Sequence, residues 1–98
     1  MSPTLSIHET AEAEINEAAD FYDIESPGLG SVFIDEIQRA LKSIVDFPDA
    51  ASLLRGRVRK RIMTKFPYSL VYSVRRDEIR VLAAAHHKRR PFYWRSRR

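Results

Sequence analysis

Cationic side chains, histidines and tyrosines gather in the second half of the sequence, where together they could cleave RNA without a metal ion. That reaction needs a base for the 2′-hydroxyl, an acid for the leaving oxygen and cations for the phosphorane charge. The imidazole of His86 could act as acid or base, and Tyr93 could assist. The mid-chain cations are Arg57, Arg59, Lys60, Arg61 and Lys65. A nuclease would take its catalytic groups from Arg59, Arg61, His86, Arg89 and Tyr93.

Two observations weigh against cleavage. The carboxylates of this half, Asp77 and Glu78, lie in a predicted hairpin turn, so the cationic cluster has no obvious carboxylate base. His86 also has a structural interpretation, as a residue hydrogen-bonded at the end of a strand. A function based on binding alone therefore stays open beside catalysis.

Metal and cofactor chemistry are not expected. The sequence contains no cysteine, which excludes thiolate ligands, Cys nucleophiles and disulfides. Adjacent histidines on a strand point to opposite faces, so His86 and His87 do not easily share one ion, and His8 is far away in sequence. We expect no metal and no cofactor.

The net charge of +4 conceals a strong asymmetry between the two halves of the chain. Residues 1–49 hold eleven acids and two bases, a net charge of −9, whereas residues 50–98 hold fifteen bases and two acids, a net charge of +13. Such a concentration of positive charge repels itself in the compact state. It predicts an anionic partner, which is a nucleic acid, an acidic protein segment or both. The alternative is that the charge only keeps a small protein soluble.

The length of 98 residues predicts one domain, residues 1–98, and the hydrophobic content of 44% is enough for one core. No apolar run approaches the roughly 18 residues of a membrane span, and the first ten residues lack the pattern of a signal peptide. We therefore expect a cytoplasmic protein that does not interact with membranes.

Hydrophobic periodicity indicates the elements that must position these groups. A short strand is predicted at residues 3–8, where Leu5 and Ile7 alternate with polar residues. Helical stripes follow from Glu9 to about Tyr22 and from about Ser31 to Asp46, separated by the turn signal of residues 25–30. Residues 49–56 read as a loop, and three alternating strands follow at residues 57–63, 68–74 and 79–86.

The resulting order, β-α-α-β-β-β, predicts an α+β fold with an antiparallel helical hairpin packed on one face of a C-terminal antiparallel sheet. Strict alternation in the last strand sends Ile79, Val81, Ala83 and Ala85 toward the helices. The opposite face is predicted to be partly open and edged with arginine, with Met63, Val71, Leu82 and Ala84 forming a groove for an acidic, apolar-anchored segment. Alternatively, these are scattered surface apolar residues.

The tail, residues 87–98, combines six bases with Phe92, Tyr93 and Trp94. Pro91 fits neither a helix interior nor a central strand, so we predict an extended arm. The aromatic residues could instead fold back over the sheet, or the arm could form an interaction hot spot or stacking platform. We expect Trp94 to pack while Arg89, Arg90 and Arg95 face a partner. Removing residues 88–98 should then abolish activity and leave a folded domain.

The last two strands and the tail resemble the C-terminal half of ParE-like toxins of the ParE/RelE superfamily. The matching segments are Phe66-Pro-Tyr-Ser-Leu-Val-Tyr72, the strand Ile79–His86 and Arg89-Arg-Pro-Phe-Tyr-Trp94. The N-terminal half agrees, since its first helix ends in Phe21-Tyr22 and its second is followed by Phe47-Pro48. The resemblance covers nearly the whole chain, and the tail motif is its most specific part.

This resemblance implies a toxin that inhibits growth, stabilises plasmids and is neutralised by a cognate antitoxin in a hetero-oligomeric complex. Two kinds of target occur in the superfamily: ParE-like members inhibit DNA gyrase, and RelE-like members cut mRNA on the ribosome. RelE-like nucleases carry an arginine directly before the Leu-Val-Tyr of the third strand, where this sequence has Ser69. A hydroxyl does not supply a fixed positive charge, which favours gyrase inhibition over cleavage. The expected binding residues are Arg57, Arg59, Arg61, Leu82, His86, Arg89, Arg90, Tyr93, Trp94 and Arg95.

Overall fold

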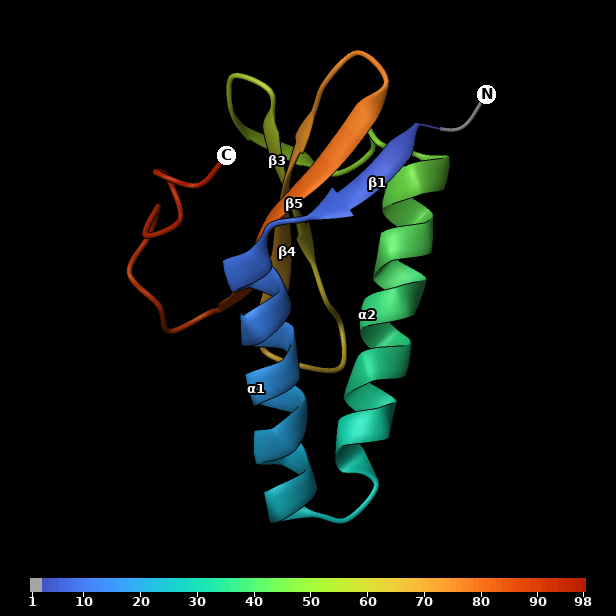
Figure 1. The fold of residues 1–98 in the computed structure, drawn as a ribbon, viewed down its shortest axis with the longest axis vertical. Helices are drawn as coiled ribbons and strands as arrows, with labels where there is room; N and C mark the ends of the chain where they lie inside the picture. Colours follow the sequence, from blue (N-terminus) through green and yellow to red (C-terminus); the bar gives the residue numbers. More distant parts are fainter. Residues whose placement is uncertain (1–2) are drawn as a thin grey trace.

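Two helices pack against a five-stranded mixed sheet in the computed structural model, which describes residues 3–98 (Figure 1). In chain order the elements are β1 (Thr4–Ile7), α1 (Glu9–Glu25), α2 (Leu29–Asp46), β2 (Ser52–Arg55), β3 (Val58–Ile62), β4 (Tyr68–Val74) and β5 (Glu78–His86). The strands lie in the order β1-β5-β4-β3-β2. The predicted α+β fold with its helical hairpin is confirmed, and the first two residues of the predicted domain lie outside the described part.

Local interactions fix both ends of the turn between the helices and the start of α1. The His8 ring accepts a hydrogen bond from the Thr10 amide at 3.0 Å and caps the N-terminus of α1. Asp23 accepts one from the Gly30 amide at 2.7 Å, which joins the end of α1 to the start of α2. A Cβ at Gly30 would lie 2.5 Å from the Ala19 carbonyl oxygen, so glycine allows this close approach.

The sheet differs from the predicted one in two ways. The C-terminal strands β3 to β5 are antiparallel as predicted, and β1 adds to β5 in parallel, so the whole sheet is mixed. β2 forms where the sequence analysis predicted a loop, and it pairs with β3 at the sheet edge. A four-residue edge strand, Ser-Leu-Leu-Arg, has no alternation that could distinguish it from a loop.

A β-bulge in β5 overturns the predicted alternation of its second half. Val71 pairs with Ala83 and Tyr72 with Val81, so Leu82 is the extra residue. Beyond it the faces are exchanged, because Ala84 packs on the helix side whereas Ala83 and Ala85 belong to the opposite cluster.

The predicted open-face groove is therefore half right. Val71 and Leu82 do lie on the face opposite the helices. Met63 and Ala84 do not, since both belong to the helix-side core. Loss of alternation at the bulge explains Ala84. Met63 lies outside the strand, in the connection from β3 to β4, where strand alternation no longer applies.

β3 also presents its arginines to the other side from the one predicted. Arg59 pairs with Tyr72 and Arg61 with Leu70, and both partners belong to the helix-side core. Residues paired across strands share a face, so these two arginines lie on the helix side. Lys60 pairs with Val71 and lies on the tail side. Both faces of β3 carry cations, so its alternation alone does not identify the inner face.

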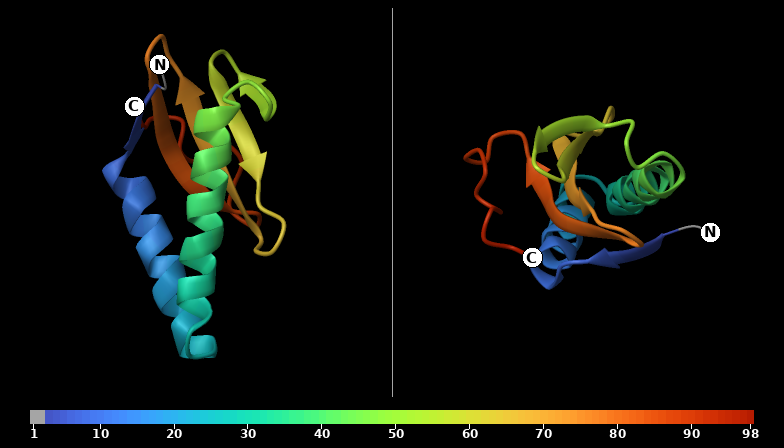
Figure 2. Two further views of the ribbon diagram at one scale, coloured as in Figure 1. Left: turned by 90° about the vertical axis from the view of Figure 1, so that its right-hand side faces the viewer. Right: turned by 90° about the horizontal axis from the view of Figure 1, so that it is seen from above.

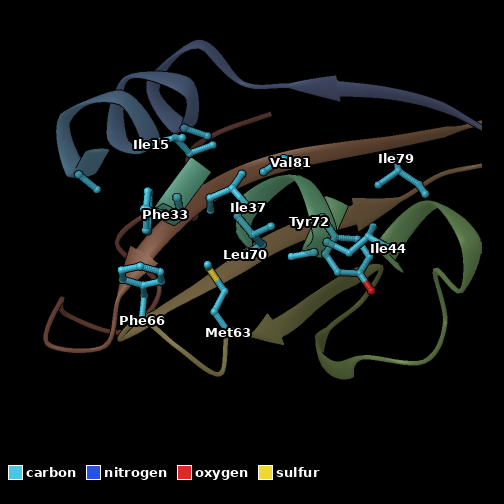
Figure 3. Packing of buried hydrophobic residues seen from close by; sticks show 14 residues of the cluster. Ile15, Phe33, Ile37, Ile44, Met63, Phe66, Leu70, Tyr72, Ile79 and Val81 are labelled. Carbon is cyan, nitrogen blue, oxygen red and sulfur yellow. The ribbon is translucent and has the colours of Figure 1, made fainter. Parts of the chain in front are cut away.

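The main core lies between the helical hairpin and the sheet (Figure 3). Its largest fully buried side chains on the helix side include Tyr72, Phe33, Ile44, Leu70 and Ile79. At one end of this core the rings of Tyr22, Phe33, Phe66 and Tyr68 pack against one another with centroids 4.9–6.5 Å apart. Tilted and edge-on aromatic packing of this kind favours a fixed position of the hairpin on the sheet.

A second, smaller core lies under the tail, which folds back over the opposite face of the sheet (Figure 2). Trp94 packs there on Val71, Leu82 and Ala83. The prediction that Trp94 packs is confirmed, and the prediction of an extended arm is wrong, because residues 91–96 form successive turns. The aromatic content of the tail outweighs the extending effect of Pro91, since the rings have an apolar sheet face to cover.

A candidate cationic and aromatic binding surface

The tail and the sheet face beneath it border a pocket of about 400 Å³, here called the tail pocket. Its lining consists of Leu54, Lys60, Ile62, Ser69, Val71, Ala85, His86, His87, Arg89, Arg90, Pro91, Phe92, Tyr93 and Trp94. Apolar and aromatic side chains supply most of this lining, and no carboxylate contributes to it. The pocket therefore suits a ligand that combines apolar groups with negative charge.

Hydrogen bonds join the end of β5 to the connection between β3 and β4 just before the tail begins. The His87 amide donates to the Pro67 carbonyl at 2.8 Å, and the His87 ring lies 3.0 Å from the Ser69 hydroxyl. The Arg89 amide donates to the His86 carbonyl at 2.9 Å, which turns the chain back toward the sheet. These bonds fix the point from which the two exposed residues Arg89 and Arg90 project.

The two adjacent histidines face opposite sides, as predicted. The His86 ring packs edge-on against Tyr68 with centroids 5.0 Å apart, on the helix side. The His87 ring contacts Ser69, which pairs with Ala85 of the tail-side cluster. Among residues 3–98, no three His, Asp or Glu side chains come together as a potential metal site.

Phe92 has an unusual backbone conformation within the tail. Its φ of 60° lies in the left-handed region, which residues with a Cβ seldom adopt. Its ring is 39% exposed and contacts the buried Trp94 ring with centroids 5.5 Å apart. Strained backbone of this kind concentrates at functional sites. The Phe92 conformation places its partly exposed ring at the tail pocket, beside the buried ring of Trp94.

Glu14 of α1 clamps the tail onto the molecule. Its carboxylate accepts hydrogen bonds from the Tyr93 hydroxyl at 2.8 Å and from both terminal nitrogens of Arg97 at 2.8 and 3.1 Å. The side chains of Glu14 and Arg97 are each only 13% exposed. A bidentate arginine–carboxylate ion pair is among the stronger charge-assisted hydrogen-bonded interactions in proteins.

The same two side chains cap an open stretch of the β5 edge. β1 pairs with β5 only as far as Val81, so the edge beyond it has no neighbouring strand. Glu14 accepts from the Ala84 amide at 3.1 Å, and Arg97 donates to the Leu82 carbonyl at 3.0 Å. The clamp therefore satisfies backbone groups that would otherwise be available for strand pairing.

The clamp alters proton affinities at Tyr93 and Arg97. Burial, followed by the hydrogen bond to Glu14, raises the pKa of Tyr93 well above its usual range. The hydrogen bond to Glu14 raises the pKa of Arg97, against the opposing effect of burial. Tyr93 thus keeps its proton and donates a hydrogen bond to Glu14, which makes it a poor general base.

The predicted binding residues form two separate groups. His86, Arg89, Arg90, Tyr93 and Trp94 all border the tail pocket. Leu82 lies in the core beneath the tail at 4% exposure, and Arg95 is exposed on the tail.

Arg57, Arg59 and Arg61 belong to the other group. Arg59 donates to the carbonyls of Asp49 and Ala51 at 3.1 and 2.8 Å, so it anchors the connection between α2 and β2. Arg57 is exposed beside the turn between β2 and β3. The five groups considered for RNA cleavage are therefore divided between the two faces of the sheet and do not surround one point.

Sequence reasoning missed Glu14 and Arg97. Glu14 looked like one more acid on a charged helix, and Arg97 like one more base in the tail. Only the packing of the tail against α1 distinguishes the two residues from their neighbours. A weak signal existed, because Glu14 is followed by Ile15 and lies beside the apolar stripe of α1.

Comparisons with known proteins agree with the fold. A sequence model of the ParE toxin of the type II toxin–antitoxin system parDE matches residues 5–91. A chain from the solved chromosomal ParDE toxin–antitoxin system of P. aeruginosa is similar in fold, with a TM-score of 0.75 and 20% sequence identity. The alignment covers 87% of this chain and 96% of that one. No curated protein sequence gives a significant match. The family match spans most of the chain, and the protein belongs to the ParE toxin family of type II toxin–antitoxin systems.

Proposed function

We propose that residues 1–98 form one cytoplasmic toxin domain that a cognate antitoxin neutralises in a hetero-oligomeric complex. The observation that carries this proposal is the tail pocket, which combines an apolar floor with the cations Lys60, Arg89 and Arg90. An antitoxin segment with apolar anchors and acidic flanks fits that chemistry. None of the helices among the described residues has both the length and the apolar character needed to cross a bilayer.

The proposed target of the toxin is DNA gyrase, which it inhibits by binding. Membership of the ParE family supports this choice over the ribosome. The tail combines exposed arginines with the rings of Phe92 and Tyr93, a composition enriched at protein–protein hot spots.

The positions of the cleavage candidates also favour binding over catalysis. The Tyr93 hydroxyl donates its hydrogen bond to Glu14 and does not point into an open site. Ser69 is 2% exposed and contacts the His87 ring, so this position presents no charge to a phosphate. Arg59 is occupied by two backbone carbonyls.

Induced expression tests the function in cells. The proposal expects growth arrest with a DNA-damage response and loss of supercoiling, relieved when the adjacent antitoxin gene is expressed. R89Q/R90Q should be much less toxic, whereas R39Q/K42Q, which removes two exposed charges from α2, should remain toxic. Rapid translation arrest with codon-specific mRNA cuts would contradict gyrase inhibition and indicate that the toxin cleaves RNA.

A further inference from the structure

Two hairpin turns lie side by side at one end of the sheet (Figures 1 and 2). The first joins β2 to β3 at residues 55–57, and the second joins β4 to β5 at residues 75–77. The Val74 amide donates to the Arg57 carbonyl at 3.0 Å, and the Arg75 amide donates to the Glu78 carbonyl at 2.8 Å. These backbone bonds hold the two turns in a fixed relation.

Four of the six residues in the two turns are arginines. The turns read Arg-Gly-Arg and Arg-Arg-Asp, and all six residues are exposed. Gly56 adopts a φ of 55°, so the first turn is tight and brings its two arginines close together. We call Arg55, Arg57, Arg75 and Arg76 the arginine end.

The four guanidinium groups have no partner within the described residues. No side-chain hydrogen bond or ion pair joins any of them to another described residue, whereas Arg59 and Arg97 are fully engaged elsewhere. Asp77 is the one carboxylate in the turns. Like charges gathered at one end of the sheet repel one another, and among the described residues no ion pair compensates these four arginines.

The composition of the arginine end distinguishes between kinds of anionic partner. Protein interfaces have an apolar centre, and neither turn contains an apolar side chain. Single-stranded nucleic acids stack their bases on aromatic rings, and neither turn contains an aromatic side chain. Duplex DNA needs neither feature, because it presents a regular array of phosphates that guanidinium groups bind with two parallel hydrogen bonds.

We propose that the arginine end is a second interaction surface, which binds the phosphate backbone of duplex DNA without sequence preference. It is separate from the tail pocket and adds to the proposed toxin function. A toxin with both surfaces can contact DNA while the tail engages a protein target.

The test is a fluorescence-anisotropy titration of the full-length chain against a labelled duplex of about 20 base pairs over a series of salt concentrations. The logarithm of the association constant should fall linearly with the logarithm of the salt concentration. The slope should fall by about 0.9 for each arginine that contacts a phosphate, hence by up to about 3.6 in R55Q/R57Q/R75Q/R76Q. Circular dichroism checks that this variant is folded, and R75Q/R76Q gives a milder version should it be unstable.

The matched control is R39Q/K42Q/K65Q/K88Q, which removes the same charge from residues outside both surfaces and should keep nearly the original slope. Four outcomes would overturn the proposal: no binding at about 50 mM salt, an equal loss in the control, tighter binding to the single strand than to the duplex, or equally tight binding to polyglutamate. None of these measurements uses gyrase or antitoxin, so their failure leaves the toxin function untouched.

Discussion

At the scale of single residues, the most informative side chain is Glu14. One carboxylate on α1 binds Tyr93 and Arg97 of the tail and the Ala84 amide of the β5 edge. Its position connects three parts of the chain that are far apart in sequence. The shape of the tail pocket therefore depends on a residue outside its own lining.

Replacing Glu14 by glutamine should lower the free energy of unfolding by about 2 to 3 kcal/mol, because the mostly buried Arg97 loses its counter-charge. Urea denaturation measures this change. A double-mutant cycle with R97Q should show a coupling of at least about 1 kcal/mol. E17Q, on an exposed position of the same helix, should change the free energy by less than about 0.5 kcal/mol. Equal effects of E14Q and E17Q would mean that the clamp contributes nothing.

The tyrosines predict how stability depends on alkaline pH. Burial raises the pKa of Tyr22, Tyr68, Tyr72 and Tyr93 above the ordinary value of 10.0, with Tyr93 shifted furthest. The folded chain therefore keeps phenolic protons that the unfolded chain releases above about pH 10. Stability should be unaffected below that pH and fall as pH rises beyond it. Y93F should lessen this fall in stability. In an alkaline titration followed by phenolate absorbance, the variant should lack the tyrosine that ionises at the highest pH. An unchanged stability curve in Y93F would contradict the assignment.

At the scale of elements, the sequence predicted the helices and the three C-terminal strands because each has a long, regular apolar pattern. It failed where regularity ends. The bulge at Leu82 exchanged the faces of the three alanines that follow, and no residue in that apolar run marks the break. β3 carries cations on both faces, so its orientation follows from its pairing with β4.

The candidate site was predictable only in part, because composition identifies residues suited to a ligand but not their positions in the fold. The tail pocket residues stand out as a basic and aromatic segment, so Arg89, Arg90, Tyr93 and Trp94 were identified together. Arg59 and Arg61 were grouped with them because the type of residue agreed, although the sheet separates them. Composition reveals which residues suit a ligand, and only the fold reveals which of them meet.

The tail behaves as a packed element, which changes the expected effect of removing it. W94A should lower the free energy of unfolding by about 3 to 5 kcal/mol, because the ring covers Val71, Leu82 and Ala83. F92A, which truncates a ring that is 39% exposed, should cost far less. Urea unfolding of both variants checks this order. Deleting residues 88–98 should therefore destabilise the domain. A deletion variant as stable as the full-length chain would contradict the second core.

At the scale of the whole molecule, charge is segregated between the helices and the sheet. Residues 1–49 carry a net charge of −9 and residues 50–98 carry +13. Among the described residues few ion pairs cross this divide, such as the largely buried pair of Glu14 with Arg97 and the partly exposed pair of Glu36 with Lys65. They leave most of the basic surface uncompensated. The molecule thus presents a basic sheet and tail to its partners.

Antitoxin binding should be strongly salt-dependent for this reason. The screening length falls from about 10 Å at 0.1 M salt to about 3 Å at 1 M, which weakens attraction between exposed charges. Isothermal titration across this range should show the affinity dropping by more than about tenfold. R89Q/R90Q should flatten the dependence, and R39Q/K42Q should not. An affinity that salt leaves unchanged would mean that apolar anchoring dominates.

The proposed function requires this ParE-family chain to bind gyrase through its basic, aromatic tail. The most direct test is a supercoiling assay with purified gyrase and the full-length toxin after removal of its antitoxin, run beside a translation assay that detects mRNA cleavage. We expect inhibition of supercoiling, intact mRNA, and inhibition weakened by at least about tenfold in R89Q/R90Q but not in R39Q/K42Q. Unaffected supercoiling together with cleaved mRNA would contradict gyrase inhibition as the activity of this chain.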